Sequence, residues 1–332
     1  MSRTYYSIYG PYIVQFIELK NKLGYKYSDA GWALSMFDRL SIEKDVSEIA
    51  ITKEFMGEYC MIRQNEAEKT RCNRIQCISQ FARFLSDLGF KSYIPKIRWV
   101  KSNFVPYIFT KEEMQTIFMV CDKLILSHNR NTPKLLMPVI IRLLYSTGIR
   151  ISEALYLTCN DINIKDKYLI LRNCKNGKDR MVPLSDSLVK VCEEYLKYRP
   201  LFPSSRKVSK DNRFFIKPDG SPVSALSVYN NFRKILFSAH IPYGGRNLGP
   251  RLHDIRHTFS VHSLASMAES GLDLYYSLPL LSTYLGHTSL KATDSYVRLT
   301  AEMYPGLIKN VSDICSSVFP LINTNTENDE TN

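Results

Sequence analysis

The stretch Leu252-His-Asp-Ile-Arg-His-Thr-Phe259 places a histidine and an arginine three residues apart, at His253 and Arg256. Taken alone, it has an ordinary explanation, because a single histidine is more often a satisfied core residue than a functional one. It gains weight from four other short segments that flank it in the chain. Each of those segments carries a charged or titratable side chain, so the five are interpreted together.

Two of the segments precede it. Thr147-Gly-Ile-Arg-Ile-Ser-Glu-Ala-Leu155 contains Arg150, for which an ion pair with Glu153 is an ordinary structural explanation. Cys174-Lys-Asn-Gly-Lys-Asp-Arg-Met-Val-Pro-Leu184 contains Lys175 beside an Asn-Gly pair, which is a strong signal for a β-hairpin turn. Lysines are common beside tight turns, so this residue alone says little about function.

The other two segments follow it. Tyr284-Leu-Gly-His287 ends on His287, and Asp294-Ser-Tyr296 ends on Tyr296. Tyr296 is one of 21 tyrosines, so on its own it has little claim to a catalytic role. The combination is more specific than any member, because two arginines, one lysine, two histidines and one tyrosine occur in a fixed order, each in a characteristic local context.

This ordered set resembles the catalytic residues of the tyrosine recombinases, the family of lambda integrase, the Xer recombinases and Cre. The resemblance covers about residues 107–312. It includes the spacing of nine residues between His287 and Tyr296 (296 minus 287) and an acidic position, Glu153, that supports the first arginine. It implies a six-residue active site: Arg150, Lys175, His253, Arg256, His287 and Tyr296.

The chemistry of a phosphodiester explains why these residue types are needed. The attacked phosphate gathers negative charge, and guanidiniums bind its oxygens with paired, planar hydrogen bonds. We therefore expect Arg150 and Arg256 to clamp the phosphate and to stabilise the transition state. We expect His287 to donate a further hydrogen bond to the same phosphate, and His253 to help orient it or to accept the tyrosine proton.

Tyr296 is the predicted nucleophile. A phenol has a pKa of about 10, so it needs cationic surroundings or a base to attack at neutral pH. The resemblance implies that the attack gives a 3′-phosphotyrosine and releases a 5′-hydroxyl. Lys175 is the candidate general acid for that leaving oxygen, and Lys178 on the same hairpin competes for the role.

A covalent link of this kind conserves the energy of the broken bond, so rejoining needs neither ATP nor a metal ion. In agreement, the sequence contains no P-loop and no paired carboxylates for two-metal chemistry, and we expect no cofactor and no bound metal. The eight cysteines are scattered with no Cys-x-x-Cys pair, which favours free thiols.

The composition favours a nucleic-acid partner. The 332 residues are 45% hydrophobic and 23% charged, and the net charge is +12. Such a balance favours polyanions, because each contact between a cation and a phosphate releases condensed counterions; an indifferent basic surface is the alternative. No apolar run approaches the roughly 20 residues of a membrane span, and the first residues lack a signal-peptide core. A cytoplasmic location without a membrane is therefore expected.

Residues 1–90 are predicted to form an all-helical domain, which resembles the core-binding (SAM-like) domain of the family in layout and length. In the first of its four helices the predicted buried face is Tyr12, Phe16, Leu19 and Leu23. The fourth helix has the clearest apolar stripe, ended by Gly89. Four basic residues off that stripe either contact phosphates or form a solvated face: Lys69, Arg71, Arg74 and Arg83.

Residues 91–109 are predicted to be a basic linker that follows the DNA backbone. Its residues expected to contact phosphates are Lys96, Arg98 and Lys101. Residues 110–321 are predicted to form a mixed α+β, mainly helical catalytic domain with a small antiparallel sheet, opening with the capping box Thr110-Lys-Glu-Glu113. The acidic, Asn/Thr-rich residues 322–332 predict a disordered tail.

The predicted function is integration, excision or transposition of a mobile element. Recombination breaks four strands and a protomer has one nucleophile, so we expect a tetramer assembled on double-stranded DNA recombination sites. The resemblance implies that an amphipathic helix at residues 301–321 packs on a neighbouring copy; a helix folded on its own domain is the alternative. Residues 268–287 resemble recombinases carried by transposons. Two other functions are alternatives: a type IB topoisomerase, and a DNA-binding regulator that has lost catalysis.

Overall fold

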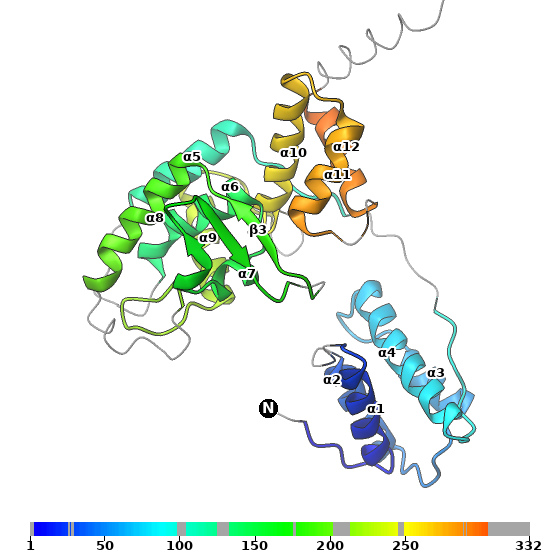
Figure 1. The fold of residues 1–332 in the computed structure, drawn as a ribbon. Helices are drawn as coiled ribbons and strands as arrows, with labels where there is room; N and C mark the ends of the chain where they lie inside the picture. The colour runs from blue at the N-terminus through cyan, green and yellow to red at the C-terminus, as the bar shows by residue number, and fades with distance from the viewer. Residues whose placement is uncertain are drawn as a thin grey trace, which may run out of the picture. The chain divides into compact units, whose positions relative to one another are not determined.

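The computed structural model describes residues 3–25, 27, 30–97, 104–124, 133–174, 177–201, 213–244, 249–287, 289 and 291–304. The chain divides into two compact units, Met1–Phe104 and Val105–Asn332, each described here by itself (Figure 1). The division falls inside the linker predicted at residues 91–109. Several predicted features lie outside the described residues: Arg98, Lys101, Lys175, most of the helix at 301–321, and the tail at 322–332.

The described residues of the first unit form four helices: α1 (Gly10–Lys22), α2 (Gly31–Glu43), α3 (Lys53–Cys60) and α4 (Glu68–Asp87). Helix α3 begins behind Thr52, whose side chain accepts a hydrogen bond from the Phe55 amide and so satisfies a free N–H of the first turn. Aromatic side chains form the core, where Phe37 and Phe81 meet edge-on with ring centroids 5.8 Å apart.

The predicted buried face of α1 is wrong by part of a turn. Phe16 is buried as expected, but Leu19 is 42% exposed and Leu23 is 61% exposed. The buried side chains are Tyr9, Ile13 and Phe16, which follow one another at spacings of four and three residues. This face contacts α4. It includes Tyr9, an aromatic residue just before the helix that the sequence pattern did not include and whose ring meets Phe81 of α4.

Within its described residues, the second unit is mainly helical and contains one small antiparallel sheet, as predicted. Its helices are α5 (Lys111–Asp122), α6 (Met137–Thr147), α7 (Ile151–Tyr156), α8 (Asp186–Tyr198), α9 (Ala225–Ser238), α10 (Asp254–Glu269), α11 (Leu274–Leu285) and α12 (Lys291–Met303), with short 3-10 turns η1 (Lys134–Leu136), η2 (Cys159–Asp161) and η3 (Arg199–Leu201). The predicted capping box is confirmed: Thr110 and Glu113 exchange hydrogen bonds at the start of α5. No helix in the described part of the chain is long and apolar enough to cross a membrane.

The sheet has the strand order β1 (Ile162–Asn163), β2 (Tyr168–Leu171) and β3 (Arg180–Pro183). The predicted hairpin is confirmed, since β2 pairs with β3 and Leu169 lies opposite Val182. The strands stop short of the Asn-Gly pair, so the connection is longer than a two-residue turn. Residues on either side of Phe214 form isolated β-bridges, Arg213 with Thr158 and Ile216 with Pro222.

Two hydrophobic cores meet along α10. Ile255, in its first turn, belongs to the core that α5 to α9 and the sheet enclose. Val261 and Leu264, one to two turns later, belong to a smaller core with side chains of α11 and α12, which lie side by side with α10 (Figure 1). The first turn of α10 therefore lies where elements from both halves of the unit converge.

Two glycines allow close approaches at this place. Gly148 ends α6 with φ +58°, and a Cβ there would collide with the Phe259 ring of α10. Gly286 follows α11 with φ +67°, and a Cβ there would lie 2.9 Å from Arg180 Nη1 of β3. Any other L-residue would be strained in this backbone conformation and would also displace its neighbour.

Candidate active site

The first turn of α10 carries the central cation of the site. Arg256 is 3% exposed and lies three residues after His253, the residue that precedes the helix. Its Nη1 donates to the Gly148 carbonyl (2.7 Å), and its Nη2 donates to the Leu285 carbonyl (2.8 Å) and to His287 Nε2 (3.0 Å). One side chain therefore joins the end of α6, the first turn of α10 and the end of α11.

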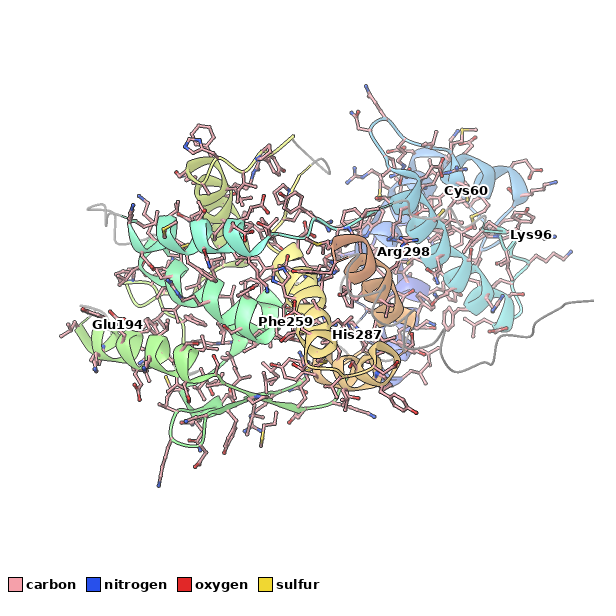
Figure 2. The ribbon with its side chains drawn as sticks, turned by 90° about the horizontal axis from the view of Figure 1, so that it is seen from above. Cys60, Lys96, Glu194, Phe259, His287 and Arg298 are labelled. Atoms are coloured by element: carbon pink, nitrogen blue, oxygen red, sulfur yellow. The ribbon has the colours of Figure 1, made fainter. Side chains whose placement is uncertain are left out.

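The contact with Arg256 decides where the ring proton of His287 lies. A guanidinium only donates hydrogen bonds, so Nε2 accepts and the proton is assigned to Nδ1, which lies 2.8 Å from Thr293 Oγ1. Burial and the charges of Arg256 and Arg150 lower the pKa of His287 to about 4. His287 lies just beyond the end of α11 (Figure 2). Its predicted hydrogen bond to a phosphate therefore requires this contact to change when DNA binds.

Glu153 orients the second guanidinium. Arg150 precedes α7, and both its amide and its Nη1 donate to the Glu153 carboxylate at 2.8 Å. The same carboxylate accepts two hydrogen bonds from Arg180 of β3, at 2.9 and 3.2 Å. Burial alone would raise the pKa of Glu153, but the bonds from Arg180 and the Arg150 amide outweigh it and lower the pKa. The carboxylate thus stays ionised between two guanidiniums.

Arg256 and Arg150 repel one another. Burial, followed by the charge of Arg150, lowers the pKa of Arg256 to about 10. None of the ion pairs between described residues involves Arg256, whose acceptors are two carbonyls and a neutral ring. Burying a cation without a counter-charge is costly, and an anion entering here would offset that cost. The pocket is therefore suited to bind a phosphate.

The Tyr296 side chain lies against the same pocket. It is 4% exposed, and its hydroxyl lies 2.9 Å from His257 Nδ1. Its ring stacks on His287 with centroids 6.3 Å apart and planes 23° apart. Burial raises the pKa of Tyr296, while the charge of Arg256 opposes the rise. The hydroxyl is thus protonated at neutral pH and lies among cations.

His253 lies beside this pair rather than against the tyrosine. Its ring meets the His257 ring edge-on, with centroids 5.0 Å apart. Burial and the charge of Arg256 lower its pKa, so the ring is biased toward its neutral form. Five of the six predicted catalytic residues thus converge here, and the sixth, Lys175, lies outside the described residues.

Arg180 fixes the base of the hairpin that carries Lys175. Besides its two bonds to Glu153, its Nη1 lies 3.0 Å from the Cys174 sulfur. The Arg180 side chain packs closely against Gly286, and a residue with a Cβ atom at that position would crowd it. The hairpin therefore starts at the pocket. Lys178, the alternative general acid, is exposed on the same loop.

One predicted DNA contact is wrong. Arg74 of α4 was expected among the basic residues off the apolar stripe, but its side chain is 0% exposed. It donates to both carboxylate oxygens of Glu66 (2.8 and 2.6 Å), and its guanidinium lies over the Tyr59 ring, 4.9 Å from the centroid. Further hydrogen bonds to the Tyr59 and Met61 carbonyls hold the cation inside the unit.

The other predicted DNA contacts in the first unit differ in exposure. Three of them are exposed: Lys69, Arg83 and Lys96. Arg71 is half-buried, and it donates to Glu68 (3.1 Å) and to the Cys60 carbonyl (2.7 Å). It is thus less available to a phosphate than the first three.

Two residues of the site were missed by the sequence reasoning, His257 and Arg180. Positions 253, 256 and 257 lie on one face of a helix, since residues three and four apart are neighbours. That spacing was a usable signal for His257. No comparable signal existed for Arg180, because its role depends on Glu153 and Gly286, which lie far from it in sequence.

Comparison with known proteins agrees with this geometry. The sequence model of the phage integrase family matches residues 108–303. The mainly helical fold and this set of side chains define the class of the tyrosine recombinases. Within that class, the chain belongs to the phage integrase family.

Individual relatives point the same way. A Sinorhizobium fredii protein named as an integrase/recombinase (y4rE) is 26% identical over 292 residues, 87% of this chain and 91% of that one. The tyrosine recombinase XerA of Pyrococcus horikoshii is 31% identical over 203 residues, 60% of this chain and 59% of that one. These relatives favour a recombinase over the two alternatives, a type IB topoisomerase and an inactive regulator.

Solved structures share the fold. The Tn1549 transposon integrase in complex with circular-intermediate DNA has a TM-score of 0.61 at 16% identity, covering 85% of this chain and 92% of that one. The XerH recombinase bound to its difH substrate has a TM-score of 0.59 at 20% identity, covering 79% of this chain and 72% of that one.

Proposed function

We propose that this tyrosine recombinase cuts and rejoins double-stranded DNA through Tyr296 during integration, excision or transposition of a mobile element. The observation that carries the proposal is Arg256, a buried cation that lies near Arg150 and whose hydrogen-bond partners in the described part of the chain include no carboxylate. The scissile phosphate supplies a counter-charge for Arg256, because the Glu153 carboxylate is already paired with Arg150 and Arg180. The hydroxyl of Tyr296 lies beside that pocket, where it can attack the phosphorus.

The reaction starts when the phosphate enters between Arg150 and Arg256. Three of the five N–H donors of Arg256 serve the fold, which leaves donors for the phosphate oxygens. The Tyr296 oxygen then forms a bond to phosphorus, and the bond from phosphorus to the 5′-oxygen breaks. Both guanidiniums stabilise the charge that develops on the non-bridging oxygens. The product is a 3′-phosphotyrosine, from which a new 5′-hydroxyl regenerates the DNA backbone without ATP or metal.

The leaving 5′-oxygen needs a proton. We assign it to Lys175, with Lys178 as the competing candidate on the same loop. The anchoring of the hairpin by Arg180 supports this assignment, since it brings the start of the loop to the pocket. His287 binds the phosphate once Arg256 has turned from His287 Nε2 to the phosphate oxygens.

The first unit is proposed to be the core-binding domain, which contacts DNA through α4. Its solvent face carries Lys69, Asn73, Gln76, Gln80 and Arg83 at helical spacing, all exposed except the half-buried Gln80. The cations at both ends suit phosphates, and the amides between them suit the edges of adenine in the major groove. Lys96, with Arg98 and Lys101, is proposed to continue the phosphate contacts along the linker.

We propose that four copies assemble on two DNA sites in the cytoplasm, because each copy supplies one nucleophile and recombination breaks four strands. A solved lambda integrase that shares the fold, with a TM-score of 0.59 at 15% identity over 89% of this chain and 78% of that one, is a tetramer bound to a Holliday junction. The helix expected at residues 301–321 is proposed to join neighbouring copies. The Tn1549 integrase relative supports a transposon as the element.

The test uses nicked duplexes tiled across the DNA that flanks the element carrying this gene. A nick near the cleaved bond lets the short product strand diffuse away, so the covalent complex accumulates. The wild-type protein should form an adduct that survives detergent, and Tyr296→Phe should form none while binding the same duplex. Tyr284→Phe is the matched control, since it removes a hydroxyl from a neighbouring tyrosine outside the pocket and should leave the adduct intact. An adduct that persists in Tyr296→Phe removes this residue from the mechanism.

A further inference from the structure

Two histidines of α10 contact tyrosine hydroxyls through the same ring atom. His257 Nδ1 lies 2.9 Å from the Tyr296 hydroxyl, and His262 Nδ1 lies 2.8 Å from the Tyr145 hydroxyl. Only the first of these tyrosines is the proposed nucleophile. In the proposed reaction His257 has no role so far, and the proton of the attacking phenol has no assigned acceptor.

We infer that His257 is a further catalytic residue, which holds the Tyr296 hydroxyl and accepts its proton as the oxygen attacks phosphorus. The inference rests on the proposed function, in which Tyr296 is the nucleophile. Among the described residues, His257 is the imidazole in hydrogen-bond contact with that hydroxyl. His253, the alternative expected from the sequence, contacts the His257 ring instead.

The charge state of His257 suits an acceptor. Burial is the main cause that lowers its pKa, to about 3, and four neighbours add to the effect: His253, Arg251, Arg256 and His287. The ring is therefore neutral at pH 7 and carries one proton. The geometry assigns that proton to Nε2, because the phenol O–H then donates to a free lone pair on Nδ1.

The proton balance of the step is complete with this residue. The O–H bond of Tyr296 breaks, its oxygen bonds to phosphorus, and the proton passes to His257 Nδ1. The bond from phosphorus to the 5′-oxygen breaks, and that oxygen takes a proton from the general acid of the hairpin, Lys175 in the proposed mechanism. Rejoining reverses each transfer, so the histidine returns to its neutral form.

The surroundings link this transfer to DNA binding. Without DNA, the cations around His257 oppose an imidazolium, so the phenol keeps its proton and the nucleophile stays inactive. A phosphate bound to Arg256 places a negative charge beside the same ring. The imidazolium is then less costly, and the proton can leave the phenol.

The first test needs no DNA. The ring ¹⁵N signals of protein with ¹⁵N-labelled histidine are recorded by NMR at pH 7. The His257 signals are assigned by their loss in His257→Asn. We expect the proton on Nε2 and an unprotonated, hydrogen-bonded Nδ1. A proton on Nδ1 would make the histidine the donor in this contact and would overturn the inference.

The second test measures adduct formation on the nicked duplex between pH 6 and 9. Asn is the conservative variant, because its side-chain oxygen can replace Nδ1 as a hydrogen-bond acceptor but takes up no proton. With His257→Asn we expect a loss of about 100-fold at pH 7, the lower range for general base catalysis. The remaining rate should rise about tenfold per pH unit, following the phenolate fraction, while the wild-type rate stays nearly flat.

His262→Asn is the matched control, because it makes the same change on the same helix at the same kind of tyrosine contact. It should cut within about threefold of the wild type, a difference below 1 kcal/mol in barrier. If His257→Asn also keeps the wild-type rate and a flat pH profile, the histidine only positions the hydroxyl, and proton acceptance is excluded. If the wild-type protein forms no adduct, the proposed function is overturned instead. The DNA-free NMR measurement tests the histidine–tyrosine contact independently of that outcome.

Discussion

Two buried arginines of this chain have opposite surroundings. Arg74, in the first unit, is 0% exposed in its side chain, and both oxygens of Glu66 bind it. Arg256, in the second unit, is 3% exposed, and its hydrogen bonds among the described residues go to two carbonyls and a neutral histidine. Burial lowers the pKa of both, but the Glu66 carboxylate reverses the effect at Arg74, whereas the charge of Arg150 adds to it at Arg256.

The difference separates a structural cation from a functional one. A buried cation whose charge is fully paired stabilises the fold around it and has nothing left to offer a ligand. A buried cation without a counter-charge raises the free energy of the DNA-free protein and gains most when an anion arrives. Burial alone therefore says little about role, and the partners of each guanidinium decide it.

Arg256 should give the largest effect on catalysis. Replacing it with Ala should lower the rate of adduct formation by about 1000-fold, since removal of a donor that stabilises developing charge costs about 3–4 kcal/mol. Arg256→Lys keeps the charge but not the planar, paired donors, so we expect a loss of about 100-fold. Both rates are measured by single-turnover cleavage of the nicked duplex, beside a gel-shift measurement of DNA affinity. Affinity and rate falling in equal proportion would argue against the clamp.

Arg74 should give the largest effect on stability. Arg74→Met leaves the buried Glu66 carboxylate without its paired guanidinium, with the Arg63 amide still donating to it, and should lower the free energy of unfolding by about 3–5 kcal/mol. Adding Glu66→Gln should recover part of this loss, because the second change removes the uncompensated charge. Urea unfolding of the wild type, the single variant and the double variant gives both values. Equal stability of the single and double variants would show that the ion pair has no specific role.

The histidines should give a smaller, pH-dependent effect. Their pKa values are lowered in the folded protein, to about 3 for His257 and about 4 for His287, against about 6.5 when unfolded. Below about pH 6.5 the unfolded chain therefore binds protons that the folded chain does not, and stability falls as the pH falls toward 4. Each histidine contributes about 1.4 kcal/mol per pH unit to this slope. Urea unfolding between pH 7 and 4.5 should show a shallower slope for His257→Phe, and an unchanged slope would contradict the neutral ring.

The fold was predictable where the local signal was strong. The Asn-Gly pair predicted the hairpin of β2 and β3, and Thr110 with Glu113 predicted the start of α5. The buried face of α1 was not predicted correctly, because the direction of a helix face depends on the partner it packs against. Leu19 and Leu23 fit the helical period, yet no partner covers them within the described residues.

The residues of the candidate site were likewise predicted only in part. Arg150, His253, Arg256, His287 and Tyr296 were selected from their order in the chain, and the structure brings them together. The sequence did not separate Arg74 from its exposed neighbours on α4, because the carboxylate that binds it lies on the preceding turn of chain and not at a helical spacing. It also passed over His257, although that residue is adjacent to Arg256.

Gly286 has a consequence for how variants of this enzyme are chosen. Because Gly286 has no side chain, Arg180 fits beside it. Arg180 in turn binds Glu153 and contacts Cys174, at the start of the loop that carries Lys175. A methyl group at this position would displace Arg180, and it would thereby disturb both Glu153 and the loop that carries the proposed general acid. Efforts to retarget the enzyme to new sequences should therefore leave this position untouched and confine diversity to the amide-bearing face of α4.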